Sequence, residues 1–418
     1  MSKAIKRVIH VFLILFLAVN ILPFGEQQAY ALVDPDVERA EIDVVYKYID
    51  LTDPTLHREG IPQIKKDYDN NELMYSLRSV LKNIPWVRKI FIIMPNDKVR
   101  FLKAPEEISD KIVYVRDKDI LGFDSSSCET FIWALWKLKE FGCSNHILFL
   151  NDDCFIGNTM KKSDFFYYDK DQGILPYIFY NAPIKYTHKN EMNSLWKQLD
   201  KETSENDEHK QNHLLYRAQN TCTFNFLYEV LNRNYLYVPT AETVHRTVHN
   251  AVGYNLNEIK DIYDIVNSQY KYADISLRRR VGRSKLGVLM GSFYTFYYLN
   301  KENRKRNEMI TYKTYDIATP NISDQLNLFC INTSGDREYS DMERLKAKIK
   351  MEQFFPEPTK YERKDYNDWA GVDLALKERL ENEMSTNKAE IKPASEVSMQ
   401  KVVNNYRQRR SFRLRRAG

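Results

Sequence analysis

Carboxylates follow two apolar runs in the first half of the chain. The stretch ILFLNDDCFIG carries Asp152 and Asp153 at the end of a strand-like run, and IDVVYKY is followed by Asp50 and Asp53. Carboxylate oxygens suit Mg²⁺ or Mn²⁺, and such an ion can neutralise the oxygens of a diphosphate. Asp152 and Asp153 therefore predict a metal site. A plain Asn-Asp-Asp turn without a ligand is the alternative.

A polar stripe on a predicted amphipathic helix is a further candidate. Asn71, Tyr75 and Arg78 recur at helical spacing, on a face distinct from the apolar one. The guanidinium of Arg78 can fork onto a phosphate. The alternative is a solvated helix face on which Arg78 pairs with a nearby carboxylate. Asp69 precedes this helix as its predicted N-cap.

The apolar pattern around these residues predicts alternating strands and helices. Strands are expected at 42–48, 89–94, 112–115 and 146–150, and helices at 70–83 and 130–141. Ser126 and Glu129 form a capping-box pattern before the second helix, and Gly142 can close it. This alternation predicts an α/β fold with a largely parallel sheet, whose ligands bind beyond the carboxyl ends of the strands. Both acidic pairs fall at such ends.

Composition and charge bound the class of protein. With 418 residues, the chain is long enough for one large domain or two ordinary ones. The 62 basic and 57 acidic residues leave a net charge of +5, much of it in the last segment, so no nucleic-acid substrate is expected. The five cysteines form no CxxC pair, which indicates neither a zinc ribbon nor a dense disulfide scaffold.

The two ends of the chain differ from its body. Residues 1–31 show positive charge, an apolar run and the triplet Ala29-Tyr30-Ala31 in the order of a secretory signal peptide, with a short membrane anchor as the alternative. A secretory signal peptide indicates the secretory pathway, and a membrane anchor indicates a membrane-associated protein that faces the cytoplasm. Residues 32–375 are expected to form the main domain, and residues 376–418 a charged helical or disordered basic tail.

Two other features favour structural roles. His245 and His249 are four residues apart, which on a helix would place both on one face as metal ligands. No Glu completes the metalloprotease pattern, so a structural role is preferred. The basic and aromatic stretch from Arg278 to Tyr298 can contact an acceptor or a membrane surface, but a solvated loop followed by a core helix is preferred.

Four ordered segments resemble the signature blocks of the Stealth proteins. IDVVYKYIDLTD resembles the first block, and DNNELMYSLRSVLKNIPWVRKIFII followed by ILFLNDDCFIG resembles the second. The segments from His213 to Arg233 and from Leu328 to Glu362 look like the third and fourth. Together they extend from Ile42 to Glu362 in family order. A chance match of four ordered blocks is remote.

The resemblance implies a GT-A-like fold, with a mixed, largely parallel sheet flanked by helices and an irregular helical C-terminal part. It also implies transfer of a hexose 1-phosphate from a nucleotide sugar, such as UDP-N-acetylglucosamine, to a hydroxyl of a glycan or polysaccharide acceptor. Nucleoside monophosphate leaves, and Mg²⁺ or Mn²⁺ assists. The alternatives are a glycosyltransferase that releases nucleoside diphosphate and a degenerate member that binds its ligand without turnover.

The resemblance also implies roles for individual residues. Asp69, Arg78 and Arg217 match active-site positions, Arg217 as the phosphate-binding arginine, and Asp152 with Asp153 match the positions near the metal. Asp69 or His188 is the expected general base. The expected donor-binding residues are Asp50, Asp53, Asn71 and Asn332.

The chain departs from the family pattern at several positions. Lys47 and Tyr48 replace Thr-Trp in the first block, and Lys185 stands where a histidine is expected, which leaves the identity of the base open. Thr333 replaces an aspartate after Asn332, a contact that Asp336 can supply. Glu129 matches an acid of the second block, although its predicted capping role explains it equally well.

Overall fold

The computed structural model describes residues 34–50, 70–123, 128–179, 219, 222–223, 226–227, 248–268, 288–301, 304–307, 309–317, 326–332, 339–370 and 372–390. The predicted leader, residues 1–31, lies outside these ranges. Of the predicted tail, residues 376–390 belong to the helix α14 (Leu374–Glu390), and the remainder lies outside. Among the described residues, no helix combines the length and the apolar character needed to cross a membrane.

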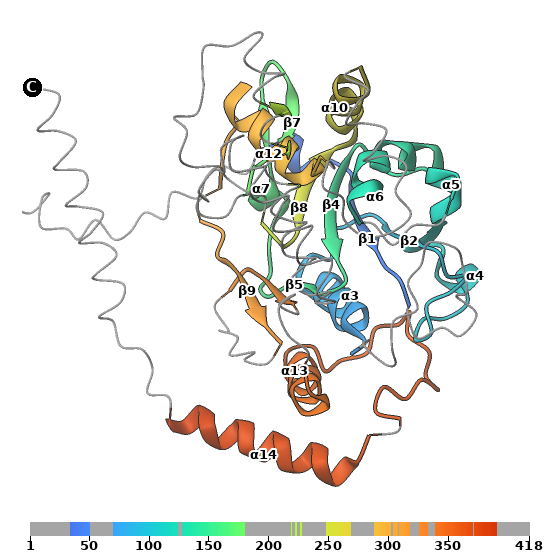
Figure 1. Cartoon of the computed structure of the whole chain (residues 1–418), viewed down its shortest axis with the longest axis vertical. Helices are drawn as coiled ribbons and strands as arrows, with labels where there is room; N and C mark the ends of the chain where they lie inside the picture. Colours follow the sequence, from blue (N-terminus) through green and yellow to red (C-terminus); the bar gives the residue numbers. More distant parts are fainter. Residues whose placement is uncertain are drawn as a thin grey trace, which may run out of the picture.

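A five-stranded sheet forms the centre of the molecule (Figure 1). Its strands, in spatial order, are β3 (Ile112–Arg116), β2 (Ile90–Met94), β1 (Ile42–Lys47), β4 (His146–Asn151) and β8 (Val252–Asn255). The first four are parallel, and only β8 is antiparallel to its neighbour. The predicted α/β class, with a mixed and largely parallel sheet flanked by helices, is therefore confirmed.

Two neighbouring strands of the sheet, β1 and β2, are covered on both faces. Every residue of β1 and of β2 is buried, and both sequences are nearly continuous runs of β-branched and aromatic residues. Four helical elements pack together beside the sheet: α6 (Cys128–Ala134), a 3₁₀ helix (Leu135–Phe141), α10 (Leu256–Ser268) and α12 (Met290–Lys301). Elsewhere α3 (Glu72–Asn83) packs on β5 (Cys154–Ile156) and on α13 (Asp341–Phe354), which lies beside α14.

Two predicted helices differ from the observed ones. α3 begins at Glu72 rather than at 70, and its N-cap is Asn71, in the left-handed conformation with φ of 60°, rather than Asp69. The backbone N–H of Asn70 donates to Oε2 of Glu72 at 2.9 Å, so the Glu72 carboxylate supplies a hydrogen-bond acceptor for the backbone just before the helix. The predicted helix over 130–141 divides into α6 and the 3₁₀ helix, because apolar spacing fits either winding. Gly142 ends it with φ of 78°, as predicted.

A smaller sheet extends the end of β4. It pairs β5 antiparallel with β10 (Leu328–Asn332) and β10 parallel with β9 (Tyr312–Asp316). The Gly157 N–H donates to the Asn327 carbonyl at 2.8 Å. A Cβ at Gly157 would lie 2.3 Å from the Leu326 carbonyl oxygen, so this close approach requires glycine.

Short elements complete the described fold. They are α2 (Pro35–Arg39), α4 (Pro105–Ile108), α5 (Asp117–Leu121), α7 (Lys162–Phe165), β6 (Phe166–Asp169) and β7 (Gly173–Pro176). The strands β6 and β7 form a separate antiparallel pair.

The aromatic residues of α12 belong to the core. Phe293, Tyr294, Tyr297 and Tyr298 are all buried. The Tyr294 hydroxyl donates to the Glu258 carboxylate, whose other oxygen pairs with Arg304 at 2.6 Å. This is the core-helix alternative for the end of the 278–298 stretch, whose basic part lies outside the described residues.

Candidate functional site

The ends of β1 and β4 meet at one edge of the central sheet. The strands are parallel neighbours, and Lys47, the last residue of β1, is the register partner of Asn151, the last residue of β4. Asp50 and the Asp152–Asp153 pair therefore leave the sheet at the same edge, as the strand pattern predicts.

A tight turn connects this edge to the smaller sheet. Asn151 ends β4, Asp152 and Asp153 form the turn, and Cys154 begins β5. The Ile331 N–H donates to the Asp153 carbonyl at 3.0 Å, which ties the acidic turn to β10. Since β10 ends at Asn332, that amide reaches the same place.

His249 stands between the two strand ends. Its Nε2 lies 2.7 Å from Asn151 Nδ2, and its Nδ1 lies 2.9 Å from Asn332 Nδ2. A neutral imidazole offers one N–H and one lone pair, so only one of the two amide nitrogens can donate to the ring, and the other amide must turn its Oδ1 toward the ring to accept the ring N–H. His249 Nε2 also lies 3.8 Å from Asp153 Oδ1. A single side chain thus links β4, the acidic turn and β10.

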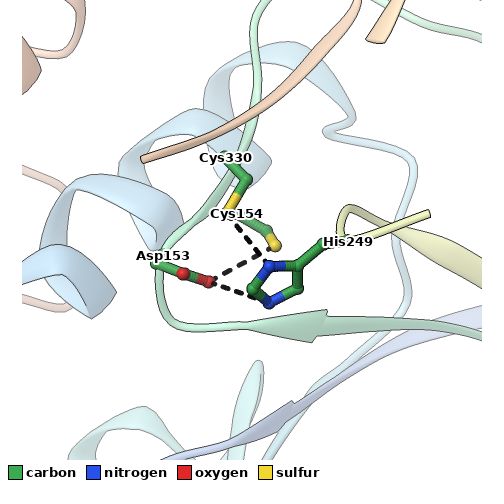
Figure 2. Close-up of side chains that lie close together, drawn as sticks. All are labelled: Asp153, Cys154, His249 and Cys330. Carbon is green, nitrogen blue, oxygen red and sulfur yellow. Dashed lines mark hydrogen bonds and ion pairs between the residues drawn. The ribbon is translucent and has the colours of Figure 1, made fainter. Parts of the chain in front are cut away.

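Two thiols complete what we call the strand-end cluster, which consists of Asn151, Asp153, Cys154, His249, Cys330 and Asn332. Figure 2 shows the thiols of Cys154 and Cys330 next to the carboxylate and the imidazole. Cys154 Sγ lies 3.5 Å from Asp153 Oδ1, and Cys330 Sγ lies 3.8 Å from His249 Nδ1. Burial raises the pKa of the Cys154 thiol to about 11, so it is protonated at neutral pH unless an ion displaces its proton.

The cluster is a possible metal-binding group. The ligand atoms of Asp153, Cys154, His249 and Cys330 all lie within 4.8 Å of one another. The carboxylate suits the predicted Mg²⁺ or Mn²⁺, whereas sulfur and imidazole donors suit softer ions. The predicted ligand Asp153 belongs to this group, and Asp152 occupies the same turn outside it.

Two other predicted site residues, Asp50 and Asn71, have protein partners. Asp50 is buried, and its Oδ2 lies 2.5 Å from Arg100 Nε. Asn71 donates to the carboxylate of Asp368, and its Oδ1 accepts from the Tyr366 hydroxyl at 3.0 Å. These contacts hold the residues in place.

Arg78 is the clearest difference from the expected site. Its Nε and Nη2 donate to the two carboxylate oxygens of Glu362 at 3.0 and 2.6 Å, and its Nη1 donates to the carbonyls of Phe355 and Pro356. The pair is buried. The structure shows the pairing with a carboxylate that the alternative predicts, but on a buried helix face rather than a solvated one, and the guanidinium that was expected to face a phosphate is bound to Glu362.

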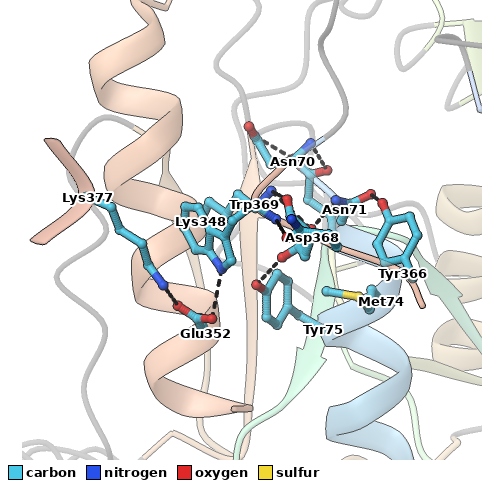
Figure 3. A network of polar contacts seen from close by, with 12 residues as sticks. Asn70, Asn71, Met74, Tyr75, Lys348, Glu352, Tyr366, Asp368, Trp369 and Lys377 are labelled. Carbon is cyan, nitrogen blue, oxygen red and sulfur yellow. Dashed lines mark hydrogen bonds and ion pairs between the residues drawn. The ribbon is translucent and has the colours of Figure 1, made fainter. Parts of the chain in front are cut away.

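The polar stripe of α3 forms what we call the α3 clamp, defined as Asn71, Tyr75 and Arg78 together with Glu362, Tyr366 and Asp368. Figure 3 shows its Asp368 end, where the Tyr75 hydroxyl donates to Asp368 Oδ2 at 2.5 Å. Lys348 Nζ lies 3.0 Å from Asp368 Oδ1. The clamp thus joins α3 to residues almost three hundred positions later, and its carboxylates are paired with cations.

Several predicted residues lie outside the described part of the chain. They are Asp53, Asp69, His188 and Arg217, together with Lys185, His245, Thr333 and Asp336. Their roles stay predictions. Glu129 belongs to α6, but its side chain is likewise outside what the structure describes.

Four members of the cluster, Asn151, Cys154, His249 and Cys330, were not predicted as site residues. His249 was paired with His245 by helical spacing, but it lies in a non-helical segment just before β8. Cys154 and Cys330 are 176 positions apart and become neighbours only because β5 pairs with β10. No sequence signal short of that strand pairing could have joined them.

A cavity of about 550 Å³ lies elsewhere on α3. It is lined by Arg78, Leu81, Lys82, Pro85, Lys111, Phe355, Pro356, Glu357, Thr359, Lys360 and Tyr361. None of these residues belongs to the strand-end cluster. We assign the chemistry to the cluster, because it joins a carboxylate, an imidazole and amides at the strand ends.

A comparison with protein families decides the affiliation of this part of the chain. Residues 66–174 match the family model described as Stealth protein CR2, conserved region 2. The chain carries a Stealth region. This Stealth segment contains the whole of α3 and the acidic turn, so the resemblance of the second block is confirmed, and the strand-end cluster takes Asn151, Asp153 and Cys154 from it.

Relatives of the Stealth segment include bacterial phosphotransferases. The chain is 30% identical over 176 residues to a capsular polysaccharide phosphotransferase of Actinobacillus pleuropneumoniae, which covers 35% of this chain and 46% of the relative. A capsular polysaccharide phosphotransferase of Neisseria meningitidis serogroup B is 27% identical and is covered to 45%. The matches therefore span less than half of these relatives. An exopolysaccharide phosphotransferase of Nocardia farcinica is 23% identical over 77% of this chain and 61% of its own length.

A distant structural likeness exists to a solved galactosyltransferase, LgtC, in complex with donor and acceptor sugar analogs. It covers 79% of this chain and 99% of the other at 12% identity, with a TM-score of 0.36. At this TM-score the likeness carries no argument about fold or function.

Proposed function

We propose that the chain is a sugar-phosphate transferase that moves a hexose 1-phosphate from a nucleotide sugar to a hydroxyl of a glycan or polysaccharide acceptor. One observation carries the proposal. Within a Stealth segment, the acidic turn after β4 meets His249 and Asn332 at the carboxyl edge of a parallel sheet. The phosphotransferase relatives support the same class of reaction. N-acetylglucosamine 1-phosphate is the proposed group, and UDP-N-acetylglucosamine the proposed donor.

The residues of the turn supply charge and position rather than a covalent step. In phosphoryl transfer, placement and electrostatic stabilisation account for most of the catalysis. Asp152 and Asp153 would hold a divalent cation, which when bound neutralises negative charge on the diphosphate. The amides of Asn151 and Asn332 hold His249 by its two ring nitrogens and so keep the strand ends together. We further propose Arg217 as a phosphate ligand and Asp69 or His188 as the base that accepts the hydroxyl proton.

The surroundings of Asp153 favour a charged ligand. Among the residues that the structure describes, no lysine or arginine pairs with Asp153, and its side chain is 17% exposed. A carboxylate placed in this way keeps its capacity to bind a cation. The carboxylates of the α3 clamp lack that capacity, because Arg78 and Lys348 already neutralise them.

The decisive experiment identifies the nucleotide that is released. Purified full chain is incubated with a panel of nucleotide sugars, Mg²⁺ or Mn²⁺ and an oligosaccharide acceptor, and the products are separated by chromatography. We expect nucleoside monophosphate, and its release should stop when the chelator EDTA removes the cation. Nucleoside diphosphate would instead identify a glycosyltransferase that attacks the sugar carbon.

A matched pair of variants separates catalysis from folding. Asp152→Asn removes one charge from the turn, and Asp171→Asn removes the same charge from an exposed position after β6. Loss of monophosphate release in the first variant only supports the proposal. Equal activity in both variants would refute the assigned turn, and metal-dependent binding without any turnover would indicate a degenerate binding protein.

A further inference from the structure

Two of the possible metal ligands in the strand-end cluster are thiols. We infer that Asp153, Cys154, His249 and Cys330 form a binding site for a thiophilic divalent cation, Zn²⁺ foremost. Figure 2 shows the four side chains directed toward one point, each offering one ligand atom. The inference concerns what the cluster binds and does not require the proposed transferase reaction.

The distances between the ligand atoms suit a tetrahedral ion. Cys154 Sγ lies 3.5 Å from Asp153 Oδ1, and Cys330 Sγ lies 3.8 Å from His249 Nδ1. Zinc bonds of about 2.3 Å to sulfur and about 2.0 Å to nitrogen or oxygen place tetrahedral ligands about 3.3 to 3.8 Å apart. With all four ligand atoms within 4.8 Å of one another, side-chain shifts of about 1 Å are enough to close the site around an ion.

The backbone brings the thiols together before any ion binds. Cys154 on β5 and Cys330 on β10 are direct register partners in the antiparallel pair. Such partners lie about 5 Å apart at their Cβ atoms, so two sulfurs can face one ion. The site therefore needs no CxxC motif, because strand pairing does the work that close sequence spacing does in zinc ribbons.

The cluster also has an open side and a second layer of contacts. His249 is 37% exposed and Asp153 is 17% exposed, so an ion can enter past these two side chains, while both thiols are buried. When one ring nitrogen of His249 binds the ion, the other carries the proton and donates it to the side-chain oxygen of its amide partner, Asn151 beside Nε2 or Asn332 beside Nδ1, once that amide turns its Oδ1 toward the ring. A hydrogen bond to the distal nitrogen is the usual support of a metal-binding histidine.

Core packing and a hard cation explain this set of residues less well. A buried free cysteine is commonly a small apolar side chain, but an apolar core gains nothing from a carboxylate and an imidazole against its thiols. Mg²⁺ prefers six oxygen ligands, whereas thiolate and imidazole select zinc. Zinc at the cluster would use one carboxylate oxygen of Asp153, and the other oxygen, together with Asp152, stays available to the hard cation.

The test measures metal binding directly. The full chain, purified under reducing conditions and stripped with a chelator, is dialysed against Zn²⁺, and bound metal is counted by elemental mass spectrometry. We expect one zinc ion per chain. Replacement by Co²⁺ should give the intense ultraviolet absorption of thiolate-to-cobalt charge transfer, a signature that oxygen ligands do not produce.

Three variants decide whether the cluster is responsible. Cys330→Ser and His249→Gln should each weaken zinc binding by at least about 100-fold, more than the loss of an outer hydrogen bond would cause. Cys143→Ser, which removes another buried thiol outside the cluster, should bind zinc like the parent chain. His249→Gln covers the case in which Cys330→Ser unfolds, because His249 is partly exposed and its loss opens no core cavity.

The outcomes are distinct. No bound zinc in the folded parent chain, or equal zinc binding by His249→Gln and Cys143→Ser, would overturn the inference. Magnesium-dependent release of nucleotide from a chain that binds no zinc would overturn the zinc site alone and leave the transferase proposal standing. Zinc binding without any transfer would overturn the transferase proposal and leave the zinc site standing.

Discussion

The strand-end cluster and the α3 clamp both gather polar side chains from distant parts of the chain, yet they differ in how charge is balanced. In the clamp, Glu362 and Asp368 are buried against Arg78 and Lys348. In the cluster, Asp153 meets an imidazole, a thiol and no lysine or arginine among the described residues. A polar group that is fully paired stabilises the fold, whereas one with spare ligand capacity can bind something else.

Breaking the clamp should produce the largest effect. Glu362→Gln leaves the buried guanidinium of Arg78 without its counter-charge, which should lower the free energy of unfolding by about 3 kcal/mol. Urea unfolding followed by circular dichroism measures this. Glu357→Gln, at an exposed position nearby, is the control and should change stability little. Equal stability of the two variants would show that the clamp is not structural.

Breaking the cluster should affect activity instead. Asp153→Asn removes a carboxylate proposed to hold a cation, so turnover should fall by about 100-fold or more, since bound metal contributes several kcal/mol to the transition state. The melting temperature should change little, because no lysine or arginine among the described residues loses its partner. Steady-state assays and a thermal melt test both statements. Unchanged turnover would exclude Asp153 as a ligand of the catalytic cation.

A smaller change tests a single hydrogen bond of the clamp, the one between Tyr75 and Asp368. Tyr75→Phe removes the hydroxyl that donates to Asp368 at 2.5 Å, and a lost hydrogen bond to a charged group should cost about 1.5 kcal/mol. Tyr168→Phe makes the same change on an exposed ring and should be neutral. A cost no larger than that of the control would mean that Lys348 and Asn71 satisfy Asp368 without Tyr75.

The pH dependence of stability tests the opposite end of β4. Burial lowers the pKa of His146, whose Nε2 lies 3.0 Å from the Ile174 carbonyl. The folded chain thus binds fewer protons than the unfolded chain below the ordinary histidine pKa of about 6.5. Stability should therefore fall as the pH drops through that value, by at most about 1.4 kcal/mol per pH unit. His146→Gln should reduce this slope in urea titrations at pH 7.5 and 5.5; an unchanged slope would exclude His146 as its source.

The sequence predicts the central sheet well because its signals are local. The runs 42–48, 89–94, 112–115 and 146–150 match β1, β2, β3 and β4 to within one residue at each end. Burial on both faces gives β1, β2 and most of β4 a largely apolar sequence, and the carboxyl ends of β1 and β4 lead into the acidic residues. The position of Asp153 at the carboxyl edge of the sheet could be predicted from this pattern alone.

The contacts of the site could not be predicted in the same way. Helical spacing put Asn71, Tyr75 and Arg78 on one face, but the partners Glu362 and Asp368 are fixed only by tertiary packing. The lysine at 47, a departure from the family pattern, likewise finds its partner across the fold, since Lys47 Nζ lies 3.4 Å from Asp117.

The acidic turn keeps its position only because residue 157 is a glycine and has no side chain. The strand β5 lies between Asp153 and Gly157, and a methyl group at Gly157 would collide with the Leu326 carbonyl oxygen just ahead of β10. Any side chain at position 157 must push apart the paired strands β5 and β10, which hold Asp153 near Asn332. The substitution Gly157→Ala would therefore disable the site without changing any of its ligand residues.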